Sequence, residues 1–414
     1  MEIIEPSKSG NWINQVENEW NDLLPIADKK TKSVKGKGQD RAIFKLFSLG
    51  ASTNRDDWAY SFDQAEVLEK AKLFASVFNR ENSRWQKAGK PKDTASFVDR
   101  TIKWTADLER QMMANEQTDS KIERVYKALY RPFITKFLFY SPHMVHRRYA
   151  TEAMYPSSTS RNPTILASNN RRAELGFGAS NVVPSGDYFT PDVATALPLY
   201  RYSPSGERID NITDWALRKF QAKYGKAVTK DDIFHYCYAV LHDPVYRETY
   251  AINLKREFPR IPFYPNFEQW VAWGKRLMEL HINYEEVEPW PLERVDEPKK
   301  RAEGSAPKAV LRSDHTTGNI RLDADTQLTG VPEEAWRYSL GNRTAIDWVL
   351  DQHKEKKPRD PTIREKFDTY RFADYKEKVI DLLGRVTRVS VETVAITDFM
   401  NKLNRDEWDT TGER

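Results

Sequence analysis

Basic side chains gather between residues 121 and 150, where they could neutralise the phosphates of a nucleic acid. The segment contains one acid, Glu123, and its aromatic residues alternate with the basic ones. This pattern is typical of a surface that contacts a phosphate backbone, although a solvated basic helix face with aromatic residues in the core would have the same composition. The basic residues are Lys121, Arg124, Lys127, Arg131, Lys136, Arg147 and Arg148, and we take Arg131, Lys136, Arg147 and Arg148 as candidate DNA contacts.

Four other places combine Arg with Asn or Lys. Arg and Asn can each form two hydrogen bonds to one base edge, so these are the residues that a reader of DNA sequence needs. The alternatives are that Arg55 pairs with Asp56 or Asp57, that the loop residues are simply solvated, and that the others hold parts of the protein together as buried ion pairs. The candidates are Asn54, Arg55, Asn170, Arg171, Arg172, Arg256, Arg260, Asn342 and Arg343.

We expect no complete catalytic, cofactor or metal site in this chain. Residues 35–38 (Lys-Gly-Lys-Gly) lack the spacing of a phosphate-binding loop, and residues 176–178 lack the strand–loop–helix context of a cofactor loop. His143 and His146 could share one helix face, but no third metal ligand lies nearby in the sequence. No methyltransferase Pro-Pro motif and no nuclease signature is present.

Composition indicates a folded intracellular protein. The chain has 414 residues, 12% of them aromatic, which argues against disorder. Its 65 basic and 61 acidic residues leave a net charge of +4, so a nucleic-acid surface must be a local patch. Cys237 is the single cysteine, so no disulfide framework is possible, and no apolar run approaches the about 18 residues of a membrane span. We therefore expect a cytoplasmic protein without membrane contact.

Turn and capping residues predict the elements that position these side chains. Thr229 with Asp232 should cap a helix that ends at Asp243-Pro244, where a second helix begins. Asn266 should cap a third helix. Further expectations are extended pieces between Ile43 and Tyr60, β structure at 163–167, a linker at 287–309, a hairpin at 309–322, and helices at 332–352 and 375–400.

Separate runs of helices and strands favour the α+β class. We expect two lobes. Residues 1–200 would form a mixed N-terminal recognition lobe, and residues 201–414 a mainly helical C-terminal lobe with a small hairpin.

Several sequence blocks resemble one known family. Residues 48–60 (SLGASTNRDDWAY) are similar to its G-x-x-T-N-R-D-x-W-x-Y block, and residues 130–133 (YRPF) resemble an element of adenine-methyltransferase recognition regions. Other similar blocks follow in the same order at 233–262, 280–285, 341–348 and 388–394. The family is the C-terminal specificity region of type ISP restriction–modification enzymes, and the similar blocks extend over nearly the whole chain.

The resemblance implies a phage-defence module that recognises a site in double-stranded DNA and directs N6-adenine methylation and restriction. In the family a nuclease, a helicase-like motor and an adenine-specific DNA methyltransferase precede this region, and S-adenosylmethionine, ATP and Mg would belong to those parts. The methyltransferase would act in cis or in trans. Two other functions stay open: a basic protein-interaction or structural module of a DNA-processing complex, and an enzyme with an unusual active site.

Overall fold

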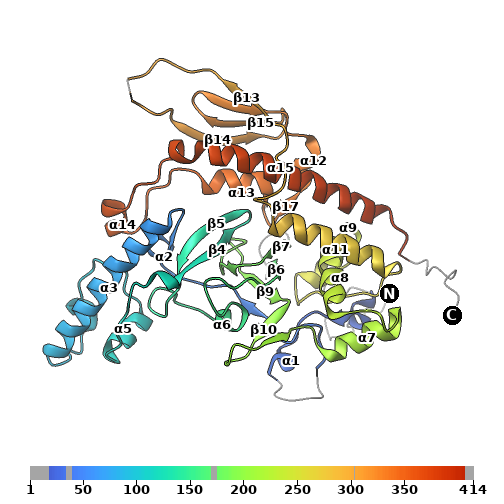
Figure 1. Cartoon of the computed structure of the whole chain (residues 1–414), viewed down its shortest axis with the longest axis horizontal. Helices are drawn as coiled ribbons and strands as arrows, with labels where there is room; N and C mark the ends of the chain where they lie inside the picture. Colours follow the sequence, from blue (N-terminus) through green and yellow to red (C-terminus); the bar gives the residue numbers. More distant parts are fainter. Residues whose placement is uncertain (1–17, 34–39, 169–174, 303, 406–414) are drawn as a thin grey trace, which may run out of the picture.

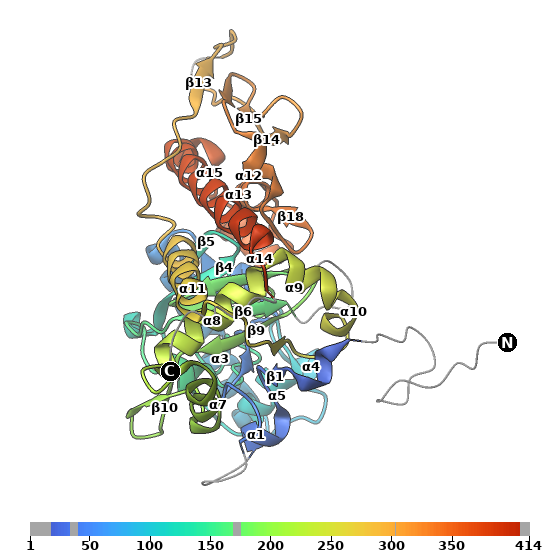
Figure 2. The same cartoon turned by 90° about the vertical axis from the view of Figure 1, so that its right-hand side faces the viewer.

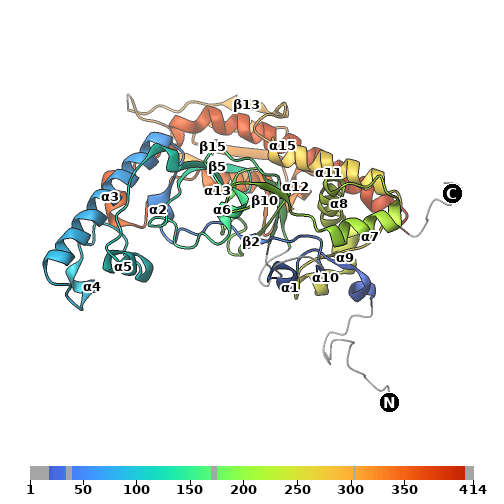
Figure 3. The same cartoon turned by 60° about the horizontal axis from the view of Figure 1, so that its bottom comes forward.

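The computed structural model describes residues 18–33, 40–168, 175–302 and 304–405, and it confirms the α+β class. Small sheets occupy the centre, and groups of helices lie on either side of them (Figures 1 and 3). None of the helices in these described ranges is long and apolar enough to cross a membrane.

Two four-stranded sheets form the centre. In the first the order is β2-β9-β6-β7, with every neighbouring pair antiparallel. In the second the order is β3-β5-β4-β8, and only the β4–β8 pair is parallel. Their bounds are β2 (Ser48–Leu49), β3 (Tyr60–Ser61), β4 (Val125–Arg131), β5 (Ile134–Phe139), β6 (Thr164–Ser168), β7 (Phe177–Ser180), β8 (Val183–Pro184) and β9 (Ala194–Pro198).

Helices cover the two ends of this centre. One group lies on both sides of β3 in the chain, and the other follows β9. The first group is α2 (Asp56–Ala59), α3 (Gln64–Lys87), α4 (Thr94–Phe97) and α5 (Ala106–Met113), with α6 (Thr151–Met154) beside the sheets. The second is α7 (Asp214–Tyr224), α8 (Lys230–His242), α9 (Pro244–Thr249), α10 (Ala251–Leu254) and α11 (Phe267–Ile282). Short pieces accompany them: a 3-10 turn at Glu19–Asp22, β1 (Leu24–Pro25), α1 (Lys29–Ser33), β10 (Tyr200–Tyr202), β11 (Arg208–Asp210) and β12 (Arg260–Ile261).

A third four-stranded sheet projects from one end of the molecule, above the long helix α15 (Figures 1 and 2). Its order is β13-β16-β15-β14, all antiparallel. The elements of this region are β13 (Glu293–Asp296), β14 (Ala309–Asp314), β15 (Asn319–Asp323), β16 (Thr326–Thr329), α12 (Glu333–Arg337), β17 (Ser339–Leu340), β18 (Arg343–Thr344), α13 (Ala345–Gln352), α14 (Pro361–Lys366) and α15 (Phe372–Lys402).

Two of the three predicted helix caps are confirmed. Thr229 and Asp232 form a complete capping box on α8, and the Asp243 carboxylate accepts from the first backbone N–H groups of α9. Asn266 precedes α11, but its side chain makes no capping hydrogen bond. The hairpin at 309–322 is confirmed as β14–β15, and the helix at 375–400 as α15.

Two other expectations are wrong in detail. Residues 332–352 form α12, the β17–β18 hairpin and α13 rather than one helix, because Gly341 takes a φ of 67° at the hairpin turn. The segment 287–309 is not only a linker, since β13 within it pairs with β16.

Hydrophobic packing does not follow a division at residue 200. One buried cluster joins Trp58 and Phe74 to Trp348 and Val386. The other joins residues before 200, such as Phe44, to the α8–α11 region. Each cluster therefore draws on both of the expected lobes, because strands and helices from distant parts of the sequence share one interior.

Four histidines are buried in this interior and are held neutral. Burial lowers the pKa of His143, His242 and His353 to about 4 each, and it lowers the pKa of His281 well below its usual value. Unfolding would expose all four to water, where a histidine has a pKa of about 6.5.

We expect the free energy of unfolding to fall as the pH is lowered from about 6.5 towards 4, since the unfolded chain then binds more protons than the folded one. Each histidine can contribute up to about 1.4 kcal/mol per pH unit in this window. Urea unfolding at pH 7, 6 and 5 measures the slope, and His353→Gln should make it shallower. A stability that is constant over this range would contradict the assignment.

Candidate DNA interface

The loop after β2 is held in place by contacts on two sides. Gly50 lies so close to Ser185 that a Cβ there would be 2.6 Å from the Ser185 carbonyl carbon, so residue 50 must lack a side chain. Two residues later, Ser52 pairs with Arg147 as an antiparallel bridge, with the Arg147 N–H donating to Ser52 at 2.8 Å. The loop therefore brings the Asn54-Arg55 pair next to the Arg147-Arg148 pair, although about ninety residues separate them in the sequence.

Arg55 holds this arrangement together from the inside. Its side chain is buried, and its guanidinium donates to the backbone oxygen of His143 and, at 3.0 Å, to the hydroxyl of Thr105. Burial lowers the pKa of Arg55 to about 10. Arg55 is therefore a structural residue in this conformation, and neither the expected DNA contact nor the alternative pairing with Asp56 is what the structure shows.

Arg131 lies inside the protein, and Lys136 is half-buried against two aromatic rings. Arg131 is buried against the ring of Tyr130 and donates to Ser185 at 3.3 Å. The Lys136 ammonium lies 4.4 Å from the ring centre of Phe62 and 4.3 Å from that of Tyr130. Burial, with the positive charge of Arg131 adding to it, lowers the pKa of Lys136 to about 7. Neither residue presents a free charge to a phosphate, which corrects the expectation.

The segment 121–150 contains the β4–β5 hairpin and the loop after it, and acids from outside the segment neutralise most of its charge. Arg124 pairs with Asp119, Lys127 with Glu285 and Arg148 with Glu152. A cavity of about 690 Å³ is lined by Arg124, the Arg148–Glu152 pair and the rings of Tyr126 and Tyr140. Glu285 is 158 residues from Lys127, so the local sequence could not reveal this neutralisation.

Arg147 differs from the paired basic residues of this segment. It is exposed, and no ion pair of its side chain is found within the described ranges. Asn54 is exposed beside it in the left-handed conformation, and its carbonyl oxygen accepts from the ammonium of Lys103. The pKa of His146 is lowered by partial burial and then by Arg147, Arg55 and Arg110, which shows that positive charge collects here. Sequence reasoning missed Lys103, because it is 49 residues from Asn54.

A second set of loops meets around residues 185–194. Gly186 lies against Gly50, and a Cβ on Gly186 would be 3.0 Å from the Gly50 oxygen. On the other side, a Cβ on Gly176 would be 2.8 Å from the Phe189 ring and 2.9 Å from the Gly341 nitrogen. The exposed Asn342 follows Gly341 directly, so it lies beside the β6–β7 hairpin.

Asn170, Arg171 and Arg172 lie outside the described residues. The described residues on either side of them are held in place: Ser168 donates from its backbone to Gly176 at 2.8 Å and pairs with Ala194 of β9. Ala194 in turn accepts from Gly50 at 3.2 Å. The end of β6 therefore lies beside the Gly50 loop.

The remaining candidates have structural contacts. Arg343 pairs with Asp351 at 2.8 Å and lies over the ring of Trp348. Arg260 donates to the Asn21 oxygen at 3.2 Å, whereas Arg256 is exposed in the turn after α10. In the part of the chain that the structure describes, no three His, Cys, Asp or Glu side chains are placed to hold a metal ion.

The family described as the Type ISP C-terminal specificity domain matches residues 42–382. A cryoEM structure of a DrdV–DNA complex is similar with a TM-score of 0.87 and 43% identity, over 98% of this chain and 40% of that one. No curated protein matches the chain significantly.

Two other solved structures are similar. One is a nuclease-deletion mutant of the Type ISP restriction-modification enzyme LlaGI with a DNA substrate mimic (TM-score 0.76, 25% identity, 96% of this chain, 30% of that one). The other is the ATP-dependent Type ISP enzyme LlaBIII bound to DNA (TM-score 0.76, 24% identity, 97% of this chain, 25% of that one), which shows the fold. The chain thus spans less than half of each of these proteins.

Proposed function

This chain belongs to the Type ISP C-terminal specificity domain family, and on that premise we propose that it recognises a short asymmetric target in double-stranded DNA. The similarity to a DrdV–DNA complex at 43% identity supports DNA as the ligand. The observation in this structure that carries the proposal is that the loops at residues 50–55 and 185–194 meet, with the exposed Arg147 bridged to the first of them, while Gly341 and Phe189 both lie against Gly176.

The proposed contacts divide into two kinds. Asn54, Asn342 and the loop of Asn170, Arg171 and Arg172 are the proposed base readers, because amide and guanidinium groups can form two hydrogen bonds to one base. Loops held by a rigid sheet suit this task, since their tips can vary without unfolding the scaffold. The proposed phosphate contacts are Lys103, Arg147 and Arg256, which are positively charged and exposed, and Arg148, which would exchange its ion pair with Glu152 for a phosphate.

The catalytic steps belong to parts outside this chain. An adenine methyltransferase, in cis or in trans, would transfer a methyl group from S-adenosylmethionine to N6 of adenine, and the motor and nuclease parts would use ATP and Mg. The specificity module would place the target for them, in the cytoplasm, and would contribute no catalytic residue.

Arg147→Ala should weaken binding to all DNA sequences about equally, because a phosphate contact carries no sequence information. The slope of log K against log salt should fall by roughly one unit. Fluorescence anisotropy with random-sequence duplexes over a salt series measures both quantities. The matched control is Arg218→Ala, an exposed arginine on α7 at another side of the molecule (Figure 1), which should leave both unchanged.

An unchanged slope for Arg147→Ala would move the phosphate surface elsewhere. If the unmodified chain binds no duplex at any salt concentration, the proposed function fails. Its basic residues would then face another protein subunit.

A further inference from the structure

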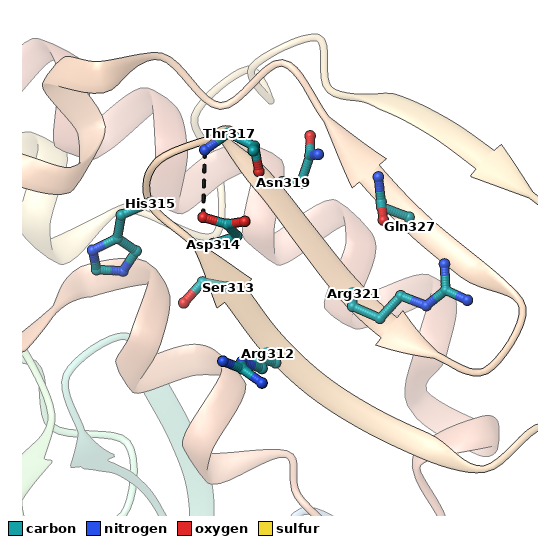
Figure 4. Close-up of a pocket in the computed structure, with 8 residues that line it drawn as sticks. All are labelled: Arg312, Ser313, Asp314, His315, Thr317, Asn319, Arg321 and Gln327. Carbon is teal, nitrogen blue, oxygen red and sulfur yellow. Dashed lines mark hydrogen bonds between the residues drawn. The ribbon is translucent and has the colours of Figure 1, made fainter.

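Polar side chains gather on the outer face of the projecting sheet, although Val295 of β13 lies directly opposite Gln327 and Val310 of β14 is exposed. A cavity of about 750 Å³ lies on this face, and Figure 4 shows the side chains around it. None of them was singled out by the sequence, and none belongs to the loops described above. The lining residues are Arg312, Ser313, Asp314, His315, Thr317, Asn319, Arg321 and Gln327.

Strand register explains why the arginine row shares a face with Asp314, Asn319 and Gln327, whereas Ser313, directly opposite Ile320, lies on the helix side and donates to Asp347. Arg312 of β14 is directly opposite Arg321 of β15, and Arg321 is directly opposite Gln327 of β16. The neighbouring row, Ile320 opposite Leu328, is buried and joins the hydrophobic cluster that contains α13 and α15. Since side chains alternate between the two faces of a strand, the arginine row must face away from the helices.

Two arginines opposite one another repel, and this repulsion normally destabilises a sheet. Arg321 is steadied by a hydrogen bond to the Ala324 oxygen at 2.7 Å, whereas no ion pair of Arg312 is found among the described residues. The acid on this face, Asp314, accepts hydrogen bonds from the backbone N–H groups of Thr316 and Thr317 in the turn. These bonds, with a smaller effect of the Arg312 charge, lower the pKa of Asp314, so this carboxylate stays ionised on the face.

We propose that this face of the β14–β15–β16 sheet is a second DNA-binding surface, on which Arg312 and Arg321 contact backbone phosphates. The inference rests on the proposed function, since it assumes that DNA is the ligand of the chain. An anion between the two guanidinium groups would remove their repulsion and gain charge-assisted hydrogen bonds. Asn319 and Gln327 add amide donors for phosphate or sugar oxygens.

DNA fits this surface better than a protein partner does. The buried centre of a protein–protein interface is rich in apolar and aromatic side chains, and this cavity is lined by none. Its one neighbouring aromatic ring, Trp336, is covered by His315, whose ring stacks on it at 4.3 Å and whose Nε2 lies 3.1 Å from Asp347. The face therefore offers a ligand the two arginine charges, partly offset by Asp314, and the amides of Asn319 and Gln327.

The test compares Arg312→Ala/Arg321→Ala with the intact chain on random-sequence fluorescent duplexes over a salt series. We expect weaker binding for every sequence and a salt slope lower by roughly two units. The control is Arg294→Ala on β13, an exposed arginine that pairs with Glu377 towards α15, and it should bind DNA as the intact chain does. Thermal unfolding checks that each variant is folded.

The outcomes separate this inference from the proposed function. If the intact chain binds DNA and the double variant binds with the same affinity and slope, this inference is wrong and the proposed function stands. If the intact chain binds no duplex, both fail. Unchanged DNA binding together with lost binding to poly-glutamate would assign the face to an acidic protein and overturn the inference.

Discussion

Gly274→Ala should destabilise the protein by about 2 kcal/mol or more, although alanine favours helix by about 1 kcal/mol over glycine. Gly274 lies where α11 crosses α8, and a Cβ there would be 1.9 Å from the backbone oxygen of His235. A backbone atom cannot turn aside as a side chain can. The two helices would have to separate, and the buried cluster between them would lose contacts.

Urea unfolding measures this effect as a lower midpoint. The matched control is Ala272→Ser, which also adds one heavy atom to α11 but at an exposed position, and it should change stability by no more than about 0.5 kcal/mol. A Gly274→Ala variant as stable as the unmodified chain would show that the two helices are not in this close contact.

Trp348→Ala should cost about 3–5 kcal/mol, because it leaves a large cavity in the core. Trp348 on α13 has no exposed surface, and its indole N–H donates to the Leu340 oxygen at 2.9 Å. The substitution therefore also leaves a buried carbonyl without its partner. Trp270 on α11 is likewise fully buried, which supports the interpretation of both tryptophans as core residues.

Trp348→Ala should lower the stability of the fold without changing which DNA sequence the folded protein prefers. Trp348→Phe keeps most of the side-chain volume and loses the hydrogen bond. It should therefore lower the free energy of unfolding clearly less than Trp348→Ala does. Unfolding midpoints of both variants and competition binding with unrelated duplexes measure the two properties. A well-folded Trp348→Ala protein with a changed sequence preference would contradict the core assignment.

Local signals in the sequence predicted local structure well. The capping box at Thr229 and the Asp243-Pro244 pair set the ends of α8 and the start of α9, because each depends on residues within one helical turn. The helix at 375–400 and the hairpin at 309–322 were also predictable, because residues near one another in the sequence determine both. Gly341 breaks the expected helix at 332–352, and its turn is visible only in the pairing of β17 with β18.

The candidate interface was predictable only in part. A count of charges between 121 and 150 could not include Glu285 or Asp119, which neutralise Lys127 and Arg124. Nor could it show that Lys136 lies between two aromatic rings. The Arg312–Arg321 row was missed because it depends on strand register, which brings together residues that look unremarkable along the chain.

Selection from a randomised duplex library tests the central claim most directly. The full chain is incubated with the library at moderate salt, and the bound duplexes are sequenced over successive rounds. We predict enrichment of one short asymmetric sequence, with affinity for it well above that for a scrambled duplex. Thermal unfolding checks that the chain is folded. If a folded chain binds all sequences equally strongly, its assignment as the module that recognises the target is contradicted.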